Sequence, residues 1–297
     1  MVKKTEEETE INMLSNRETV TSSQNKYVSL ARGLANKKNR EKERKFRFDG
    51  VKLMCEAIKK DVRLSFILAN ESEWESVLEK AEKTYGIAEN DIACPVILVE
   101  KSLFLRLSEE ISPEGVISVA EYQSDRHSYL GENENFSCEG DESILILESV
   151  RDPQNVGAIV RVAAAFGVDR ILMSGDCADI YNSKTIRASM GTVFGTRIDR
   201  ASDISRAIGD IRSCGRRVFA AALERYSKKL GELEIKRGDC IVIGNEGHGL
   251  SDSTVKACDS TVFIPMADGV ESLNAATAAA VLVWEFFGPT TFGGASK

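Results

Sequence analysis

The chain is organised around one stretch, DPQNVGAIVRVAAAFG, which spans residues 152–167. It predicts a helix, because Asp152 suits the N-cap, Pro153 suits the first helical position, and Gly167 can adopt the left-handed conformation that ends a helix. Nearly every residue between these ends is apolar, so we expect the helix to be buried on all faces. Arg161 lies in its middle, where a guanidinium needs a partner. The helix alone leaves two interpretations open: a structural salt bridge, or a cation that faces a site for something negative.

Length and composition bound the class of protein. The chain has 297 residues, which suggests two domains, and its apolar and charged fractions are ordinary for a soluble globular protein. The apolar run 275–284 is too short to span a bilayer, and the acidic N-terminus has no apolar segment typical of a signal peptide. We therefore expect a cytoplasmic protein without a membrane span. The net charge of −7 does not indicate a nucleic-acid binder, so the local distribution of charge must decide.

Cysteine and histidine usage argues against a metal site. The seven cysteines include no C-x-x-C pair, which favours reduced and mostly buried thiols. The only two histidines, His127 and His248, lie far apart in the sequence. We expect both at the surface and expect no zinc or other metal.

The N-terminal region is uneven in charge. Residues 1–24 are polar and lack periodicity, so we predict a disordered tail. Residues 32–47 then carry eight Lys or Arg and two Glu. This is either a solvated helix face or an arm that contacts phosphates, with Phe46 and Phe48 entering a strand or offering their rings to bases. The basic residues predicted to bind RNA are Arg32, Lys37, Lys38, Arg40, Arg44, Lys45 and Arg47.

Residues 25–122 alternate between helical and extended patterns and predict a small α/β domain. Its inventory of catalytic residue types is poor, so we expect a substrate-binding role. Residues 123–142 carry charges, Asn and Gly without apolar periodicity, and we interpret them as a linker. The helices expected in the small domain are 51–60, 71–85 and 101–110, and the strands are 62–69, 95–99 and 115–120.

Residues 143–290 predict a second α/β domain. Its short strands are rich in Ile and Val and alternate with helices, which is typical of a parallel sheet covered on both faces. Ligands bind such sheets at the carboxyl ends of the strands. The last helix, 273–287, is too apolar to cover only one sheet face, so we expect it also to meet a partner subunit. The expected strands are 144–147, 170–173, 218–223, 241–243 and 262–264.

Polar segments follow three of these strands and should lie at one edge of the sheet. They are residues 152–161, residues 244–250 and residues 265–274. Glu246 in the second segment is the expected partner of Arg161. Neither G-x-G-x-x-G nor G-x-x-x-x-G-K-[ST] occurs, so a dinucleotide-dependent oxidoreductase or a P-loop protein has no support.

Each of these segments also has a plain structural explanation. The glycines at 244, 247 and 249 either make a tight turn or let the backbone approach a ligand closely. Ser272 and Asn274 precede the last helix and could simply cap it.

Taken together, the three segments resemble the motifs of the SpoU (TrmH-like) family of RNA ribose 2′-O-methyltransferases, in the SPOUT superfamily. The match spans 144–287 in order and spacing, and residues 25–120 resemble the family's L30e-like substrate-binding domain. The matching residues are Asn155-x-Gly157-x-x-x-Arg161, Ser189-Met190-Gly191, Gly244-Asn245-Glu246-Gly247, and Ile264-Pro265-Met266 with Ser272-Leu273-Asn274.

The resemblance implies a deep trefoil knot in which the last helix is threaded through a loop, although chains almost never thread loops. It implies that S-adenosylmethionine binds in the knot, largely through backbone groups. It also implies a homodimer whose active site lies between the subunits. The positions that match the cofactor site are Gly244, Asn245, Ile264, Met266 and Leu273.

The resemblance also assigns catalytic roles. Arg161 is the family's proposed catalytic residue, but a guanidinium with a pKa above about 12 does not deprotonate. We therefore expect it to bind the adjacent phosphate and stabilise the developing alkoxide. Asn155 would position the ribose or Arg161, and Glu246 would orient Arg161. Ser272 and Asn274 would hydrogen-bond the substrate or the motif loops.

The separate L30e-like domain with its basic arm favours 23S rRNA as the substrate. A tRNA ribose 2′-O-methyltransferase is the alternative. A non-catalytic RNA-binding protein on the same scaffold is a further one.

Overall fold

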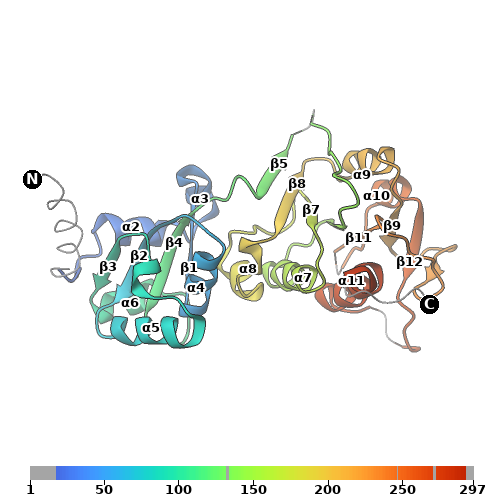
Figure 1. Ribbon diagram of the computed structural model, residues 1–297. Helices are drawn as coiled ribbons and strands as arrows, with labels where there is room; N and C mark the ends of the chain where they lie inside the picture. Colours follow the sequence, from blue (N-terminus) through green and yellow to red (C-terminus); the bar gives the residue numbers. More distant parts are fainter. Residues whose placement is uncertain (1–17, 132–133, 246, 270–271, 292–297) are drawn as a thin grey trace, which may run out of the picture. The chain divides into compact units, whose positions relative to one another are not determined.

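A computed structural model describes residues 18–131, 134–245, 247–269 and 272–291. The chain divides after Tyr122 into two compact units, 1–122 and 123–297 (Figure 1). Each unit has its own sheet and its own buried core, so each is described by itself.

The first unit is built on a mixed four-stranded sheet in the order β1-β4-β2-β3. Strand β4 runs antiparallel to β1 and β2, and β2 runs parallel to β3. Its elements are α2 (Lys26–Gly33), α3 (Lys37–Glu43), β1 (Lys45–Asp49), α4 (Val51–Lys59), β2 (Leu64–Asn70), α5 (Trp74–Lys80), η1 (Ala81–Tyr85), η2 (Glu89–Asp91), β3 (Val96–Val99), α6 (Lys101–Leu107) and β4 (Val116–Glu121).

Helices cover both faces of this sheet, as the predicted α/β layering requires. Phe66 and Leu68 of β2 face one core cluster with α2 and α6, whereas Ile67 and Ala69 face another with α4 and α5. This alternation follows from the two-residue period of a strand. Both faces are apolar because both are covered.

The predicted disordered tail is wrong for its last residues. Val20 forms a parallel bridge with Val99, and its backbone N–H donates to the Leu98 carbonyl at 2.8 Å. The free edge of β3 thus gains a partner, which satisfies backbone groups that would otherwise be exposed. Residues 1–17 lie outside the described residues.

The basic stretch divides into two kinds of residue. Phe46 and Phe48 are buried on β1, so their rings serve the core and are not offered to bases. Arg40 and Arg47 are also buried: Arg40 donates to the Leu34 carbonyl at 2.9 Å, and Arg47 donates to the Leu107 carbonyl at 2.8 Å. The predicted RNA contact is therefore wrong for these two arginines, which hold protein backbone. The side chains that stay exposed or half-buried are Arg32, Lys37, Lys38, Arg44 and Lys45.

The second unit is built on an eight-stranded, entirely parallel sheet in the order β10-β12-β9-β11-β6-β7-β8-β5. This confirms the predicted parallel α/β class. Its elements are β5 (His127–Leu130), β6 (Ile144–Leu147), α7 (Pro153–Ala165), β7 (Arg170–Ser174), α8 (Ser183–Ala188), η3 (Thr192–Phe194), β8 (Arg197–Ala201), α9 (Ile204–Ser213), β9 (Val218–Ala221), β10 (Lys228–Lys229), β11 (Cys240–Ile243), α10 (Asp252–Ala257), β12 (Ser260–Phe263) and α11 (Ala275–Thr291).

Two groups of helices cover this sheet. Helices α9 and α10 pack on each other, and α9 closes a core with Ile144, Ile146 and Leu172. Helices α7, α8 and α11 pack together on the other side, where α11 also contacts β11 (Figure 1). The trefoil knot that the resemblance implies stays a prediction, because strand order does not state which loop α11 passes through.

The predicted linker 123–142 contains a strand. Residues 127–130 form β5, which pairs in parallel with β8 at the edge of the large sheet. Strand β8 was itself not predicted, because its sequence RIDRA is mostly charged. Its Asp199 is buried and pairs with Arg170 of β7 and with the Ser128 hydroxyl of β5. Charge pairing thus replaces the apolar pattern that usually indicates a strand.

His127 is not the surface residue that the sequence suggested. Its ring lies 2.7 Å from the Tyr181 hydroxyl and 3.2 Å from the Val193 carbonyl. Burial lowers its pKa to about 4, so the ring is neutral at physiological pH. His248 is exposed as expected.

The cysteines match the expectation in part. All seven are free, but only Cys55, Cys177 and Cys240 are buried, three others are half-buried, and Cys214 is exposed. Burial raises the pKa of Cys55 to about 11. Among the described residues, no helix is long and apolar enough to cross a membrane.

Candidate functional site

Helix α7 carries the first motif and begins as predicted. The Asp152 carboxylate accepts a hydrogen bond from the Gln154 N–H at 2.8 Å, and Gly167 takes a left-handed φ of 68° after the helix. Only one face is buried, however, and it carries Val156, Gly157, Ile159, Val160 and Ala163.

Arg161 therefore lies on the exposed face of α7, which corrects the expectation of a fully buried helix. It is solvent-exposed and forms no hydrogen bond or ion pair with any other described residue. Its expected partner, Glu246, lies outside the described residues. The cation is available to a ligand.

Asn155 and Asn274 are brought together from opposite ends of the domain sequence. The Asn274 side-chain amide donates to the Asn155 side-chain oxygen at 3.0 Å. The Asn274 oxygen accepts from the backbone N–H of Ala276 at 2.9 Å, so it also caps α11. Capping and site formation are thus not alternatives, because one side chain does both.

The second motif forms a tight loop after β11. Asn245 closes it: its amide donates to the Ser149 carbonyl at 2.9 Å, and its side-chain oxygen accepts from the Gly247 N–H at 2.8 Å. A Cβ at Gly244 would lie 2.6 Å from the carbonyl oxygen of Gly249. Gly244 is therefore required for the two sides of the loop to approach each other.

Glu148 supports this loop and was not foreseen from the sequence. It is buried, and it accepts hydrogen bonds from the Ser251 N–H at 3.0 Å, the Ser251 hydroxyl at 2.8 Å and the Thr254 hydroxyl at 2.7 Å. The only signal for it was an acidic residue directly after an apolar strand. It fixes the end of the loop to the end of β6.

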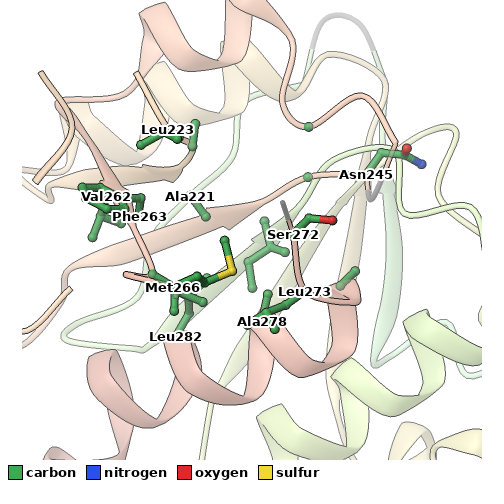
Figure 2. A pocket seen from close by; sticks show the side chains of 16 residues that line it. Ala221, Leu223, Asn245, Val262, Phe263, Met266, Ser272, Leu273, Ala278 and Leu282 are labelled. Atoms are coloured by element: carbon green, nitrogen blue, oxygen red, sulfur yellow. The ribbon is translucent and has the colours of Figure 1, made fainter. Parts of the chain in front are cut away.

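A cavity of about 340 Å³ opens where these loops meet the start of α11. Figure 2 shows Ala221, Val262 and Leu282 around it, with Asn245 and Ser272 toward one side. All five residues predicted for the cofactor line this cavity, namely Gly244, Asn245, Ile264, Met266 and Leu273. Ser272, predicted as catalytic, lines it as well.

One wall of the cavity was not predicted from the sequence. Ala221 ends β9, Ala222 and Leu223 follow it, and all three line the cavity although no motif marks them. The available signal was topological, because β9 lies between β11 and β12 and its carboxyl end must reach the same edge.

The chemistry of the cavity suits an organic ligand with an apolar body. Its lining is mostly aliphatic, with the polar side chains of Asn245 and Ser272. Gly244, Ile264 and Leu273 lie outside helices and strands, so no helix or sheet ladder claims their backbone groups. The described residues contain no group of three His, Cys, Asp or Glu side chains placed to hold a metal ion.

Two family matches agree with this architecture. Residues 142–284 match the SpoU rRNA Methylase family, and residues 25–118 match the MRM3-like substrate binding domain. The second unit is a SpoU methylase domain. The first unit carries an MRM3-like substrate-binding domain.

Similarity to known proteins extends across both units. The chain is 26% identical over 270 residues to the 23S rRNA (guanosine(2553)-2′-O)-methyltransferase of Bacillus subtilis, with 91% of this chain and 99% of that protein covered. It is 28% identical to the 23S rRNA (uridine(2479)-2′-O)-methyltransferase of Streptomyces viridochromogenes, with 72% and 71% covered. The crystal structure of an AdoMet-bound rRNA methyltransferase from Sinorhizobium meliloti is 28% identical, with a TM-score of 0.74 over 90% of this chain and 96% of that one.

The SpoU methylase domain thus has two adjoining parts: an apolar cavity at the strand ends, and a polar face on α7. Asn274 connects them, because it lies between the cavity residues Leu273 and Ala275 in the chain and bonds to Asn155 of α7.

Proposed function

We propose that this protein transfers the methyl group of S-adenosylmethionine to a ribose 2′-hydroxyl of 23S rRNA. One observation carries the proposal: the loops after β9, β11 and β12 converge on one apolar cavity that adjoins the Asn155–Asn274 pair. A cofactor site beside a polar face that carries the exposed Arg161 suits group transfer to a nucleic acid. The relatives named as 23S rRNA methyltransferases support the choice of substrate.

The residues present fit the cofactor. The aliphatic wall of the cavity would hold the adenine ring, and the loop backbone at Gly244, Ile264 and Leu273 would meet its polar edge. The cofactor supplies an electrophilic methyl group on a sulfonium. No metal is required for such a transfer, since the leaving group is already activated.

The chain's own residues would orient the acceptor ribose and stabilise the negative charge that develops on its 2′-oxygen. A guanidinium is a hydrogen-bond donor and cannot accept a proton, so we assign Arg161 to the RNA phosphate next to the target ribose and to the oxyanion that develops on the 2′-oxygen. Asn155 and Asn274 hold each other in place and would orient the ribose. Much of the rate acceleration would then come from alignment of the acceptor oxygen with the methyl carbon.

The substrate-binding unit would contribute non-specific affinity for RNA. Arg40 and Arg47 are buried. The cations of the basic stretch that remain accessible to RNA include Lys37, Lys38, Arg44 and Lys45. Each phosphate contact from such a surface would add to the salt dependence of binding.

We also propose that the protein is a homodimer. Val281 and Trp284 of α11 are 38% and 49% exposed, and the Trp284 ring meets the ring of Phe166, just after α7, at 5.4 Å. This apolar surface adjoins the exposed face of α7 that carries Arg161. A second copy would cover it and place Arg161 near the subunit interface. An rRNA-modifying role is consistent with a cytoplasmic location.

The test is methyl transfer from labelled S-adenosylmethionine to unmodified 23S rRNA and, separately, to unmodified tRNA, followed by mapping of the methylated nucleotide. The proposal predicts a 2′-O-methyl group in the 23S rRNA. Label in tRNA alone would show that the substrate is tRNA and not 23S rRNA. Cofactor binding without transfer to either RNA would indicate a non-catalytic scaffold. Arg161→Ala is expected to abolish transfer while cofactor affinity, measured by calorimetry, is nearly unchanged; retained turnover would refute its assignment.

A further inference from the structure

We propose that the exposed face of α8 binds RNA backbone phosphates beside the target ribose, through Lys184 and Arg187. The inference rests on the proposed function and deepens it, because it assigns two further substrate-binding residues to the same site.

The close contact of α7 with α8 is the first step of the argument. A Cβ at Gly157 would lie 2.3 Å from the Thr185 carbonyl oxygen and 2.7 Å from the Ala188 Cβ. Only glycine permits this approach, so the motif glycine draws the backbone of α8 onto α7. The side chains of α8 thereby share a surface with the first turn of α7.

That surface is hollowed beside the paired asparagines. A depression of about 420 Å³ is lined by Asn155 and Asn274 together with Gln154, Lys184 and Arg187. Lys184 and Arg187 are exposed and three residues apart on α8, so they project from one side of the helix. The described lining contains no carboxylate.

Arg161 lies one turn beyond the depression along α7. Gln154, Ala158 and Arg161 are spaced by four and three residues, which places them on one stripe of α7. Arg161 follows Ala158, a residue of the depression, by about 4.5 Å along the helix axis. Lys184 and Arg187 therefore lie beside the Asn155–Asn274 pair, and Arg161 follows on the same stripe of α7 as two other residues of the depression.

A polyanion suits this surface better than a small anion does. The cations are exposed and spread over two helices, whereas a site for one small anion gathers its donors around one point. A nucleic-acid backbone offers a phosphate to each cation, and the amides of Gln154 and Asn155 can bond phosphate or ribose oxygens. Such contacts set the register of the RNA without reading its sequence.

The experiment uses the full-length protein and an unmodified 23S rRNA transcript. The variants are Lys184→Ala/Arg187→Ala, the charge-keeping swap Lys184→Arg/Arg187→Lys, and the control Lys256→Ala. Lys256 is an exposed lysine on α10, which packs on α9 rather than on α7. RNA affinity is measured across a salt titration, S-adenosylmethionine affinity by calorimetry, and methyl transfer by steady-state kinetics.

The double alanine variant should lose at least about tenfold in RNA affinity, as expected when charge-assisted contacts are removed. The salt dependence of log K should weaken by about one unit of slope for each cation removed. Cofactor affinity should not change, the charge-keeping swap should recover most of the RNA affinity, and Lys256→Ala should behave as wild type.

Two outcomes would overturn the inference. One is an RNA affinity and salt slope like those of wild type in the double alanine variant. The other is a loss of cofactor affinity that equals the loss of RNA affinity, which would assign the two side chains to the cofactor or to folding. Failure of the proposed function is distinguishable, because it would appear as no methyl transfer by the wild-type protein.

Discussion

Replacement of Gly157 by alanine tests the packing on which the site depends. The added methyl group would lie 2.3 Å from the Thr185 carbonyl oxygen and 2.7 Å from the Ala188 Cβ. Both distances are far below van der Waals contact, and the nearer atom belongs to a backbone that cannot turn aside as a side chain can. Helix α8 must move away from α7 to accommodate it.

Two opposing effects set the magnitude. Alanine is favoured over glycine inside a helix by about 1 kcal/mol. Insertion of a methyl group into a packed contact costs about 1–3 kcal/mol. Because the clash involves backbone, we expect the upper part of that range and a net loss of about 1–2 kcal/mol in the free energy of unfolding. The displacement should also move Lys184 and Arg187 and weaken RNA binding.

Gly209→Ala is the matched control. Gly209 lies within α9, and a Cβ there would meet nothing within 4 Å. It should therefore raise stability by up to about 1 kcal/mol. Urea unfolding measures the stability of both variants, and hydrogen exchange in α8 locates the change. If Gly157→Ala were as stable as Gly209→Ala, with unchanged exchange in α8, the proposed role of the glycine would be refuted.

Three further predictions address the cofactor, the fold and the dimer. Gly244→Ala should raise the dissociation constant for S-adenosylmethionine at least about tenfold by calorimetry, because its Cβ would displace the Gly249 backbone. An unchanged affinity would show that this loop does not contact the cofactor. Burial lowers the pKa of His127 to about 4, whereas histidine in the unfolded chain has a pKa of about 6.5. As the pH falls below about 6.5, the unfolded chain therefore binds a proton that the folded chain does not. About 2 kcal/mol of the free energy of unfolding should be lost by about pH 5. Urea titrations should find this loss reduced in His127→Gln, and an identical pH profile would contradict it. Trp284→Glu should shift sedimentation equilibrium toward the monomer, and an unaltered assembly state would exclude this face as the interface.

The motifs and the parallel α/β class could be read from the sequence because they depend on local patterns. The Asp152 cap and the parallel sheet follow from capping preferences and from the run of short apolar strands. The five residues expected at the cofactor were named from the family resemblance, and they line one cavity. Of the two roles left open for Gly244, the structure shows the tight turn, because a Cβ there would meet the Gly249 backbone.

Other features depended on which residues tertiary packing brings together. The charged sequence of β8 forms a strand because Asp199 pairs with Arg170. Arg47, which was expected to contact RNA, is buried because it donates a hydrogen bond to the Leu107 carbonyl. Neither partner is near in sequence, so no local pattern reports it.

The helix predicted over 152–167 shows both kinds of feature, those set by the local sequence and those set by tertiary packing. Its sequence by itself determined the cap, the helix and the presence of one cation. Only the tertiary structure decided that Arg161 is exposed and that Asn155 faces Asn274, 119 residues away. It also decided that Gly157 holds α8 against the helix. A local sequence sets the conformation of its own backbone, whereas exposure and partners depend on which distant segments pack against each face.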